Sequence, residues 1–349
     1  MFTVLLFLCI YLLHDYSSST MINFTYNDKS YTTFYPKVAD IFNAEFVNNR
    51  IELPVDTGKG FMELVPLGEE IYASINNFVL EKDIYFTRKK SRDVFFILHF
   101  DEMKSAGDFM VRLDGEMIKT KGHSIAAAML TCSLFDLSYM LPAHTKKRSI
   151  SVILTREWIK KYMNMGVDDD EICNNYFSLK VQHLNQEPFN TEYRAYFNQV
   201  FDTPFNRPLR LLHIRNAVMM LIEIFFIRLY KKTKSIKDIP ARKMNTGDLY
   251  KLMEVESILV KDFSKAPPTI VDLAAYTKMS VSKLKSAFKE VYGTGIYEYY
   301  QKNRMRKARN MLISHNFTVK EVGMKLGYSN LSNFSLAFKK EFGLLPSQL

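Results

Sequence analysis

The sequence has few cysteines and no pair of them close enough to form a common metal or redox motif. Cys9, Cys132 and Cys173 are odd in number and widely separated, which excludes a disulfide framework and a structural zinc site as organising features. A phosphate-binding glycine loop and a nucleophile elbow are also missing. We therefore expect no catalytic residue, no cofactor and no metal, and a chain that stays reduced in the cytoplasm.

Long hydrophobic runs are scarce, and the one near the start of the chain is short. Residues 1–13 are apolar, but a bilayer-spanning helix needs about 20 such residues, and no lysine or arginine precedes the run. We interpret residues 1–20 as a leader produced by a start codon upstream of Met21. The alternative is a secretory signal. We expect no membrane contact from the remaining chain.

Acidic residues are under-represented in one part of the chain only. Residues 250–349 contain 16 Lys and Arg against 8 Asp and Glu, which accounts for most of the formal net charge of +10. The other 249 residues are nearly balanced. A chain of 349 residues is long enough for two or three domains, and the basic region is about the size of one of them. The positive sign of this charge favours an anionic polymer as the partner of that domain. A solvated basic surface is the alternative.

A helical pattern occurs twice in this basic region. Thr269 with Asp272, and Thr318 with Glu321, match the capping box that begins a helix. Apolar residues follow at positions i, i+3, i+4 and i+7, and a second amphipathic segment begins after a short turn. Two such helices joined by a tight turn form a helix-turn-helix. The units are predicted at residues 269–290 and 318–340.

The second helix of each unit has one apolar face and one polar face. Gly327 favours the left-handed turn that ends a helix, and Ser280 and Ser329 are predicted caps of the second helices. Hydroxyl, amide and ammonium groups bind base edges and phosphates, and the polar faces contain no acidic residue. The predicted base or groove contacts are Ser282, Lys283, Lys285, Ser286, Ser332, Asn333, Ser335 and Leu336. The predicted phosphate contacts are Ser280, Lys289, Ser329, Lys339 and Lys340.

Residues 295–314 lie between the two units, contain no proline and are predicted to form one helix. Twenty residues at about 1.5 Å each give a rod of roughly 30 Å. One turn of DNA is about 34 Å long, so the rod would place the two polar faces in successive major grooves. The alternative is a helical bundle with an ordinary polar surface.

These residues resemble the DNA-binding domain of the AraC/XylS family of bacterial transcription regulators. The motifs that carry the resemblance include Arg304, Ala308, Gly327, Tyr328, Phe334, Phe338, Lys339, Gly343 and Pro346. The resemblance implies an all-α, seven-helix domain with two helix-turn-helix units, and a transcription activator that contacts RNA polymerase. Ser286 and Leu336 depart from it, because many members have arginine there. This departure favours weaker base readout or a larger contribution from DNA shape.

The upstream region is predicted to be mainly β-structure, and the whole chain an α+β multidomain protein. Strands are predicted within residues 61–67, 78–86, 93–100, 108–117 and 148–155, and helices at 156–165 and 190–201. This order is compatible with the cupin-like barrel that senses a small-molecule effector in many relatives. We divide the chain into a sensor domain (21–200), a helical dimerisation or linker region (201–246) and a DNA-binding domain (247–349).

Residues 208–232 are strongly apolar and are predicted to form a packed helix. Their methionines and phenylalanines favour a hydrophobic core over a ligand site. The same helix is a candidate for homodimer formation. Residues 231–247 are the candidate flexible junction.

Two other functions fit parts of the sequence. His99 and Asp101 alternate on a predicted strand, as two ligands of an iron site would, with His123 or His144 as the third ligand. That arrangement would make the N-terminal domain a metal-dependent enzyme. A DNA-binding architectural protein without an effector is the second alternative. The main prediction is a sequence-specific, effector-responsive transcription regulator.

Overall fold

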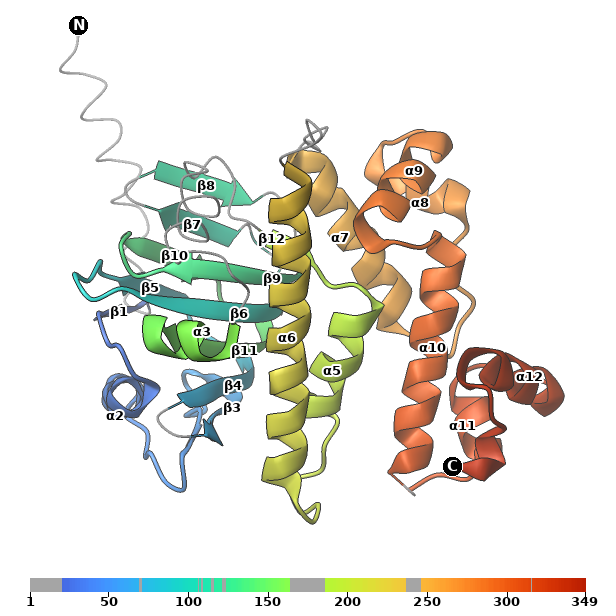
Figure 1. Ribbon diagram of the computed structural model, residues 1–349, viewed down its shortest axis with the longest axis horizontal. Coiled ribbons are helices and arrows are strands. Elements are labelled where there is room, and N and C mark those ends of the chain that lie inside the picture. The colour runs from blue at the N-terminus through green and yellow to red at the C-terminus, as the bar shows by residue number, and fades with distance from the viewer. Residues whose placement is uncertain are drawn as a thin grey trace, which may run out of the picture.

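The computed structural model places a β-sheet region beside a bundle of helices, with α5 (Thr191–Phe201) and α6 (Arg210–Ile236) between them (Figure 1). It describes residues 21–68, 71–105, 107, 109–113, 116–120, 124–163, 186–236, 246–314 and 316–349. The leader, Cys9, Cys173, His123 and most of the predicted junction lie outside these residues. Within them, no helix combines the length and apolar character needed to cross a membrane.

Twelve described strands form two sheets, which confirms the mainly β prediction for the N-terminal region. The strands are β1 (Ile22–Tyr26), β2 (Arg50–Glu52), β3 (Gly58–Gly68), β4 (Ile71–Leu80), β5 (Ile84–Arg88), β6 (Phe95–Lys104), β7 (Phe109–Leu113), β8 (Glu116–Thr120), β9 (Ser124–Cys132), β10 (Leu137–Leu141), β11 (Lys146–Thr155) and β12 (Gln186–Pro188). Their orders are β1-β5-β10-β7-β8 and β12-β9-β6-β11-β4-β3-β2. The described strands therefore form two sheets and not one hydrogen-bonded barrel.

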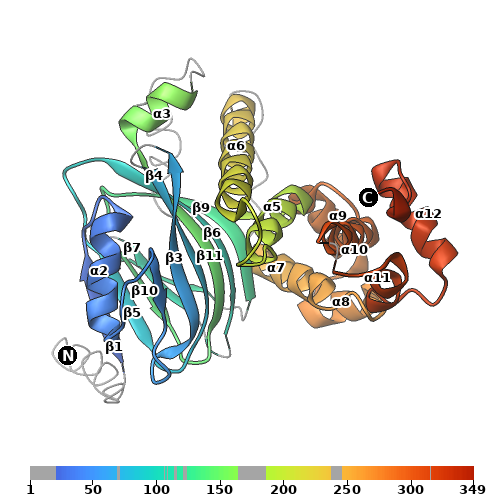
Figure 2. The same cartoon turned by 90° about the horizontal axis from the view of Figure 1, so that it is seen from below.

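The sheets curve around a common interior, with α2 (Tyr31–Phe42) along one side (Figure 2). The sequence analysis missed α2, because Pro36 lies inside it. Ser30 caps the helix, and α2 buries Tyr35 and Phe42 toward the interior. Two predicted strands were wrong in extent, since residues 78–86 include a turn between β4 and β5, and residues 108–117 contain parts of both β7 and β8. Between β4 and β5, Glu81, Lys82 and Asp83 favour a turn over a continued strand.

After β11, the described residues form α3 (Arg156–Met163), α5 (Thr191–Phe201) and α6 (Arg210–Ile236) before the C-terminal region begins. Helices α5 and α6 pack on the seven-stranded sheet through a shared apolar core that includes Phe197, Leu221 and Phe225. The prediction of a packed helix at 208–232 is therefore confirmed. Most of its large apolar side chains serve this core because the helix covers one face of the sheet.

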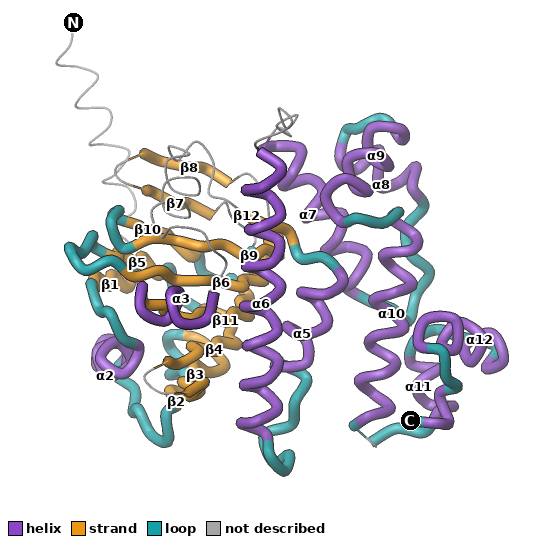
Figure 3. The backbone as a smooth tube through the Cα atoms, in the orientation of Figure 1, coloured by secondary structure: helices purple, strands orange, loops and turns teal. Residues whose placement is uncertain are grey.

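The C-terminal region is helical, as predicted. Its elements are α7 (Thr246–Lys261), α8 (Ile270–Thr277), α9 (Val281–Tyr292), α10 (Ile296–Ile313), α11 (Val319–Lys325), α12 (Leu331–Phe342) and the 3-10 helix η1 (Pro346–Gln348). Figure 3 shows α10 as the long helix between the pair α8–α9 and the pair α11–α12. One apolar core joins α7, α8, α9 and α10, and a second joins α10, α11 and α12.

Candidate nucleic-acid interface

The first helix-turn-helix unit consists of α8 and α9. Thr269 accepts a hydrogen bond from the Asp272 backbone N–H, and the Asp272 carboxylate accepts one from the Thr269 N–H, so the predicted capping box is confirmed. Lys278 takes the left-handed conformation at the turn, with φ +53°. Ser280 caps α9 as predicted, accepting a hydrogen bond from the Lys283 N–H. This local chemistry fixes where α9 begins and therefore which side chains its outer face carries.

The second unit, α11 and α12, repeats this arrangement with one difference. Thr318 and Glu321 form the second capping box, and Gly327 has φ +74° as predicted. The predicted cap Ser329 is wrong. Asn330 caps α12, and its side-chain oxygen accepts from the backbone N–H groups of Ser332 and Asn333. Asparagine is as good a cap as serine, so the sequence alone did not separate the two adjacent residues.

Helix α10 links the two units at the predicted position, and the two ends of it serve different cores. Tyr299 and Tyr300 are buried against the first unit, whereas Ala308 and Leu312 are buried against the second. Arg304 donates to the Leu326 carbonyl oxygen at 2.9 Å, and its guanidinium lies 3.9 Å from the centre of the Tyr328 ring. These contacts fix the second unit on the connector, which explains the arginine and tyrosine of the family motif.

The outer face of α9 carries the first group of predicted DNA-binding residues. Ser282, Lys285, Ser286 and Lys289 are exposed. Lys283 is also exposed, but its ammonium lies 2.7 Å from the Asp248 carboxylate of α7. The sequence expectation that this face is free of acidic groups was therefore incomplete, because a residue from another helix supplies one. The predicted base or groove contact of Lys283 would require its ammonium to leave Asp248.

The outer face of α12 carries the second group. Ser332, Asn333, Lys339 and Lys340 are exposed, and Ser335 is half-buried at the edge of this face. Leu336 is 66% exposed, which leaves its methyl groups free for an apolar contact. The DNA-contact roles of all these residues remain predictions.

The two groups of lysines share an electrostatic environment near α10. Lys302, 2.8 Å from the Glu298 carboxylate, lowers the pKa of Glu298, and Lys289 of α9 and Lys340 of α12 lower it further. The fold therefore brings one predicted phosphate contact from each unit within range of a single carboxylate on the connector. Sequence spacing alone does not give this proximity.

A buried charge network connects the helical region to the sheets, and the sequence analysis missed it. Arg194 of α5 donates to the Glu256 carboxylate of α7 at 2.6 Å and also pairs with Glu102 of β6. Burial raises the pKa of Glu102, but Arg194 and Arg148 outweigh this effect and bring it to about 2. The Tyr299 hydroxyl donates to Glu256 at 2.8 Å. One ionic cluster thus holds α7 and α10 against α5 and β6. Because its members are far apart in the sequence, no local motif reveals it.

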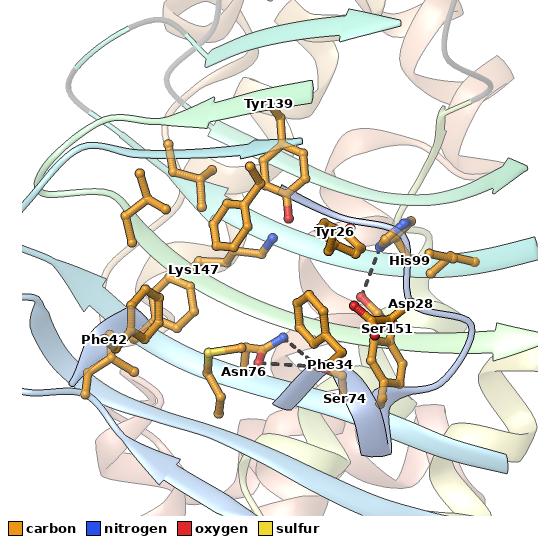
Figure 4. A pocket seen from close by; sticks show the side chains of 18 of the residues that line it. Tyr26, Asp28, Phe34, Phe42, Ser74, Asn76, His99, Tyr139, Lys147 and Ser151 are labelled. Carbon is orange, nitrogen blue, oxygen red and sulfur yellow. Dashed lines mark hydrogen bonds between the residues drawn. The ribbon is translucent and has the colours of Figure 1, made fainter. Parts of the chain in front are cut away.

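The interior between the sheets contains a small cavity of about 60 Å³ (Figure 4). His99 and Asp101 face this interior from β6, as strand alternation predicted. Burial lowers the pKa of His99 to about 4, and the ring lies 3.0 Å from the Ser151 hydroxyl. Asp101 lies 3.5 Å from the Lys147 ammonium. His144 is exposed and faces Glu81 instead. Among the described residues, no three acidic, histidine or cysteine side chains are placed to share a metal ion.

Residues 273–349 match the family model described as a helix-turn-helix domain. The C-terminal region is a helix-turn-helix domain of the AraC type, as the motifs around Arg304 and Gly327 predicted. The match begins within α8 and includes both α9 and α12.

Two curated relatives are similar to part of this chain. The transcriptional regulator GbdR of Pseudomonas aeruginosa is 23% identical over 146 residues, 41% of this chain and 40% of the relative. AlkR of Acinetobacter baylyi is 31% identical over 84 residues, 24% of this chain and 28% of the relative. The similarity thus spans less than half of either relative.

One solved structure, an AraC-type transcriptional regulator from Chromobacterium violaceum, is 28% identical. It covers 30% of this chain and 92% of its own, with a TM-score of 0.27.

Proposed function

We propose that this protein is a sequence-specific, DNA-binding transcription regulator that acts in the cytoplasm. Its two helix-turn-helix units would enter successive major grooves, with α9 and α12 as the reading helices. The observation that carries the proposal is the pair of capped, outward-facing helices joined by the rigid α10, both bearing hydroxyl, amide or ammonium groups. RNA polymerase would be the protein partner, as in related activators. We propose no catalytic activity.

The contacts proposed here divide by chemistry. Lys289, Lys339 and Lys340 would neutralise phosphates and supply the salt-dependent part of the affinity. Asn333 is suited to the bidentate pairing that amides make with adenine, and Leu336 to contact with a thymine methyl group. The proposed base readout is therefore concentrated in the second unit.

We further propose that the β-sheet region senses a small-molecule effector through its interior cavity. The cavity has apolar walls with polar groups from Asn76, His99 and Lys147, which suits an amphipathic ligand (Figure 4). Its volume of about 60 Å³ has room for about four water molecules, so a ligand would require the sheets or α2 to move apart. Helix α6, whose Leu211 and Leu212 are half exposed, is the proposed surface for a homodimer.

The experiment that tests DNA reading is selection of the full chain on randomised duplex DNA, with sequencing at two salt concentrations. Two short enriched blocks about one helical turn apart would support paired major-groove reading. Salt-sensitive binding without any enriched sequence would instead favour an architectural DNA-binding protein. Lys104→Ala, an exposed lysine of the sheet region, serves as the charge-matched control for lysine variants in α9 and α12.

A further inference from the structure

A second cavity lies where the helical region meets the sheets. It has a volume of about 70 Å³ and is bounded by β6, β11, α5, α7 and α10. Its lining includes four cationic side chains and one carboxylate, together with amide groups. The residues used below are Glu102, Arg148, Arg194, Arg306, Lys307 and Asn310. Four of the eleven lining residues are cationic, and cations that are partly buried together are costly unless other groups compensate their charge.

Most of these charges have a partner. Arg194 is shared by Glu256 and Glu102, and Arg148 donates to Glu102 at 2.6 Å. Lys307 lies 2.9 Å from Asp202. Three carboxylates, Glu102, Glu256 and Asp202, therefore pair with three of the four cations.

Arg306 is the cation in excess. Its guanidinium donates to the backbone carbonyl oxygen of Thr191, a neutral acceptor, and no carboxylate of the described residues lies within ion-pair distance, 4.0 Å. Glu192, Glu290 and Glu341 line a neighbouring groove on which Arg306 also borders, but none pairs with it. One positive charge at this junction thus remains uncompensated, and an arginine fork has donors to spare.

Neutral donors stand beside this charge. The Asn198 side-chain oxygen accepts a hydrogen bond from Arg148 at 3.3 Å, which leaves the Asn198 amino group as a donor. The side chain of Asn310 lines the same cavity and makes no hydrogen bond within the described residues. Amide and guanidinium donors around one excess positive charge match the hydrogen-bonding needs of a small oxyanion.

We propose that this cavity binds one small oxyanion, a phosphate-like or carboxylate ion, through Arg306 with Asn198 and Asn310. The ion neutralises the excess charge and bridges α10 to α5. It therefore strengthens the docking of the helical region on the sheets. The volume admits a few waters or a single small anion and excludes a nucleic-acid backbone. This site is separate from the proposed DNA-reading faces and does not depend on them.

The test is calorimetric titration of the full chain with inorganic phosphate, and separately with acetate, at constant ionic strength set by chloride. We expect one site per chain. Arg306→Gln removes a charge-assisted hydrogen bond and should weaken binding about tenfold or more. Arg309→Gln, an exposed arginine on the same helix, is the matched control and should bind like the wild type. Tighter binding of phosphate identifies a tetrahedral oxyanion, and tighter binding of acetate identifies a carboxylate.

Absence of saturable binding of both ions to the wild type would overturn the proposal, as would equal affinity in Arg306→Gln. If Arg306→Gln does not fold, Arg306→Lys keeps the charge without the fork, and it should bind several-fold more weakly than the wild type. An Arg306→Lys affinity equal to that of the wild type would exclude the guanidinium contact. General stabilisation by phosphate acts equally on all variants, so the comparison with Arg309→Gln removes it.

Discussion

The two helix-turn-helix units begin from nearly the same local sequence and end in different tertiary settings. The first shares its apolar core with α7, and α7 is fixed to the sheet region through Glu256 and Arg194. The second has its own smaller core and joins the rest of the molecule through α10 and Phe263. The local motif therefore determines the shape of each unit, while long-range contacts determine how firmly each is attached.

The outer faces of α9 and α12 also differ between the two units. In the first unit Lys283 is already paired with Asp248, whereas the second unit presents Asn333 and Leu336 without such a partner. An anchored unit with partly compensated charge suits positioning on the phosphate backbone. A unit that presents an amide and a free apolar side chain suits base reading. Four predictions test this contrast.

The largest effect is expected from breaking the anchor of the first unit. Arg194→Met leaves the buried Glu256 without its cation and leaves Glu102 with Arg148 alone, and it should lower the free energy of unfolding by about 3–5 kcal/mol. Denaturant unfolding of the full chain measures this. Lys307→Met, which breaks a half-exposed pair with Asp202, is the control and should change stability by about 1 kcal/mol or less. Equal effects of the two variants would mean that the buried cluster is not the anchor.

The turns of the two units should respond oppositely to substitution. A Cβ atom at Gly327 would lie 2.2 Å from the Ser264 carbonyl oxygen at a φ of +74°. Gly327→Ala should therefore cost about 2–5 kcal/mol. Lys278 has a similar φ in the first unit, so Lys278→Gly relieves strain and should raise stability by about 0.5 kcal/mol. The thermal unfolding temperatures of the two variants measure these effects. A lower unfolding temperature in both variants would contradict the prediction.

Base discrimination should depend on the second unit. Asn333→Ala removes the amide and should reduce discrimination by about 1–3 kcal/mol at its base position. Ser282→Ala, an exposed position on the outer face of α9, should alter preference less. Competition binding with single-base variants of the selected site measures both. An unchanged preference in Asn333→Ala would remove that residue from base readout.

The smallest effect concerns salt dependence. Lys339→Ala should reduce the slope of log affinity against log salt by about 1 without changing base preference, because one phosphate contact is lost. Lys283→Ala should reduce the slope by less, since Asp248 already compensates that ammonium. Affinity titrations at several salt concentrations test this, and a larger change for Lys283→Ala would reverse the assignment.

Local features were the part of the fold that the sequence predicted well. The capping boxes at Thr269 and Thr318 and the α10 helix rest on interactions within a few residues, so a pattern of neighbours is sufficient. The sequence predictions failed where the outcome depends on contacts beyond the neighbouring residues. Ser329 and Asn330 are both good caps, and only the course of the backbone selects Asn330. Helix α2 forms in spite of Pro36 because tertiary packing of its aromatic face outweighs the local cost.

The sequence by itself predicted two helices with polar faces, separated by the connecting helix at residues 295–314. It also placed most of the positive charge in this region. Only the tertiary structure decided which of those charges are free. Asp248 pairs with Lys283 and Glu256 with Arg194 across long stretches of sequence, whereas Arg306 has no carboxylate partner in the part of the chain that the structure describes. The physical reason is that helix capping and amphipathic periodicity act over a few residues, whereas electrostatic compensation depends on distances that exist only after the chain has folded.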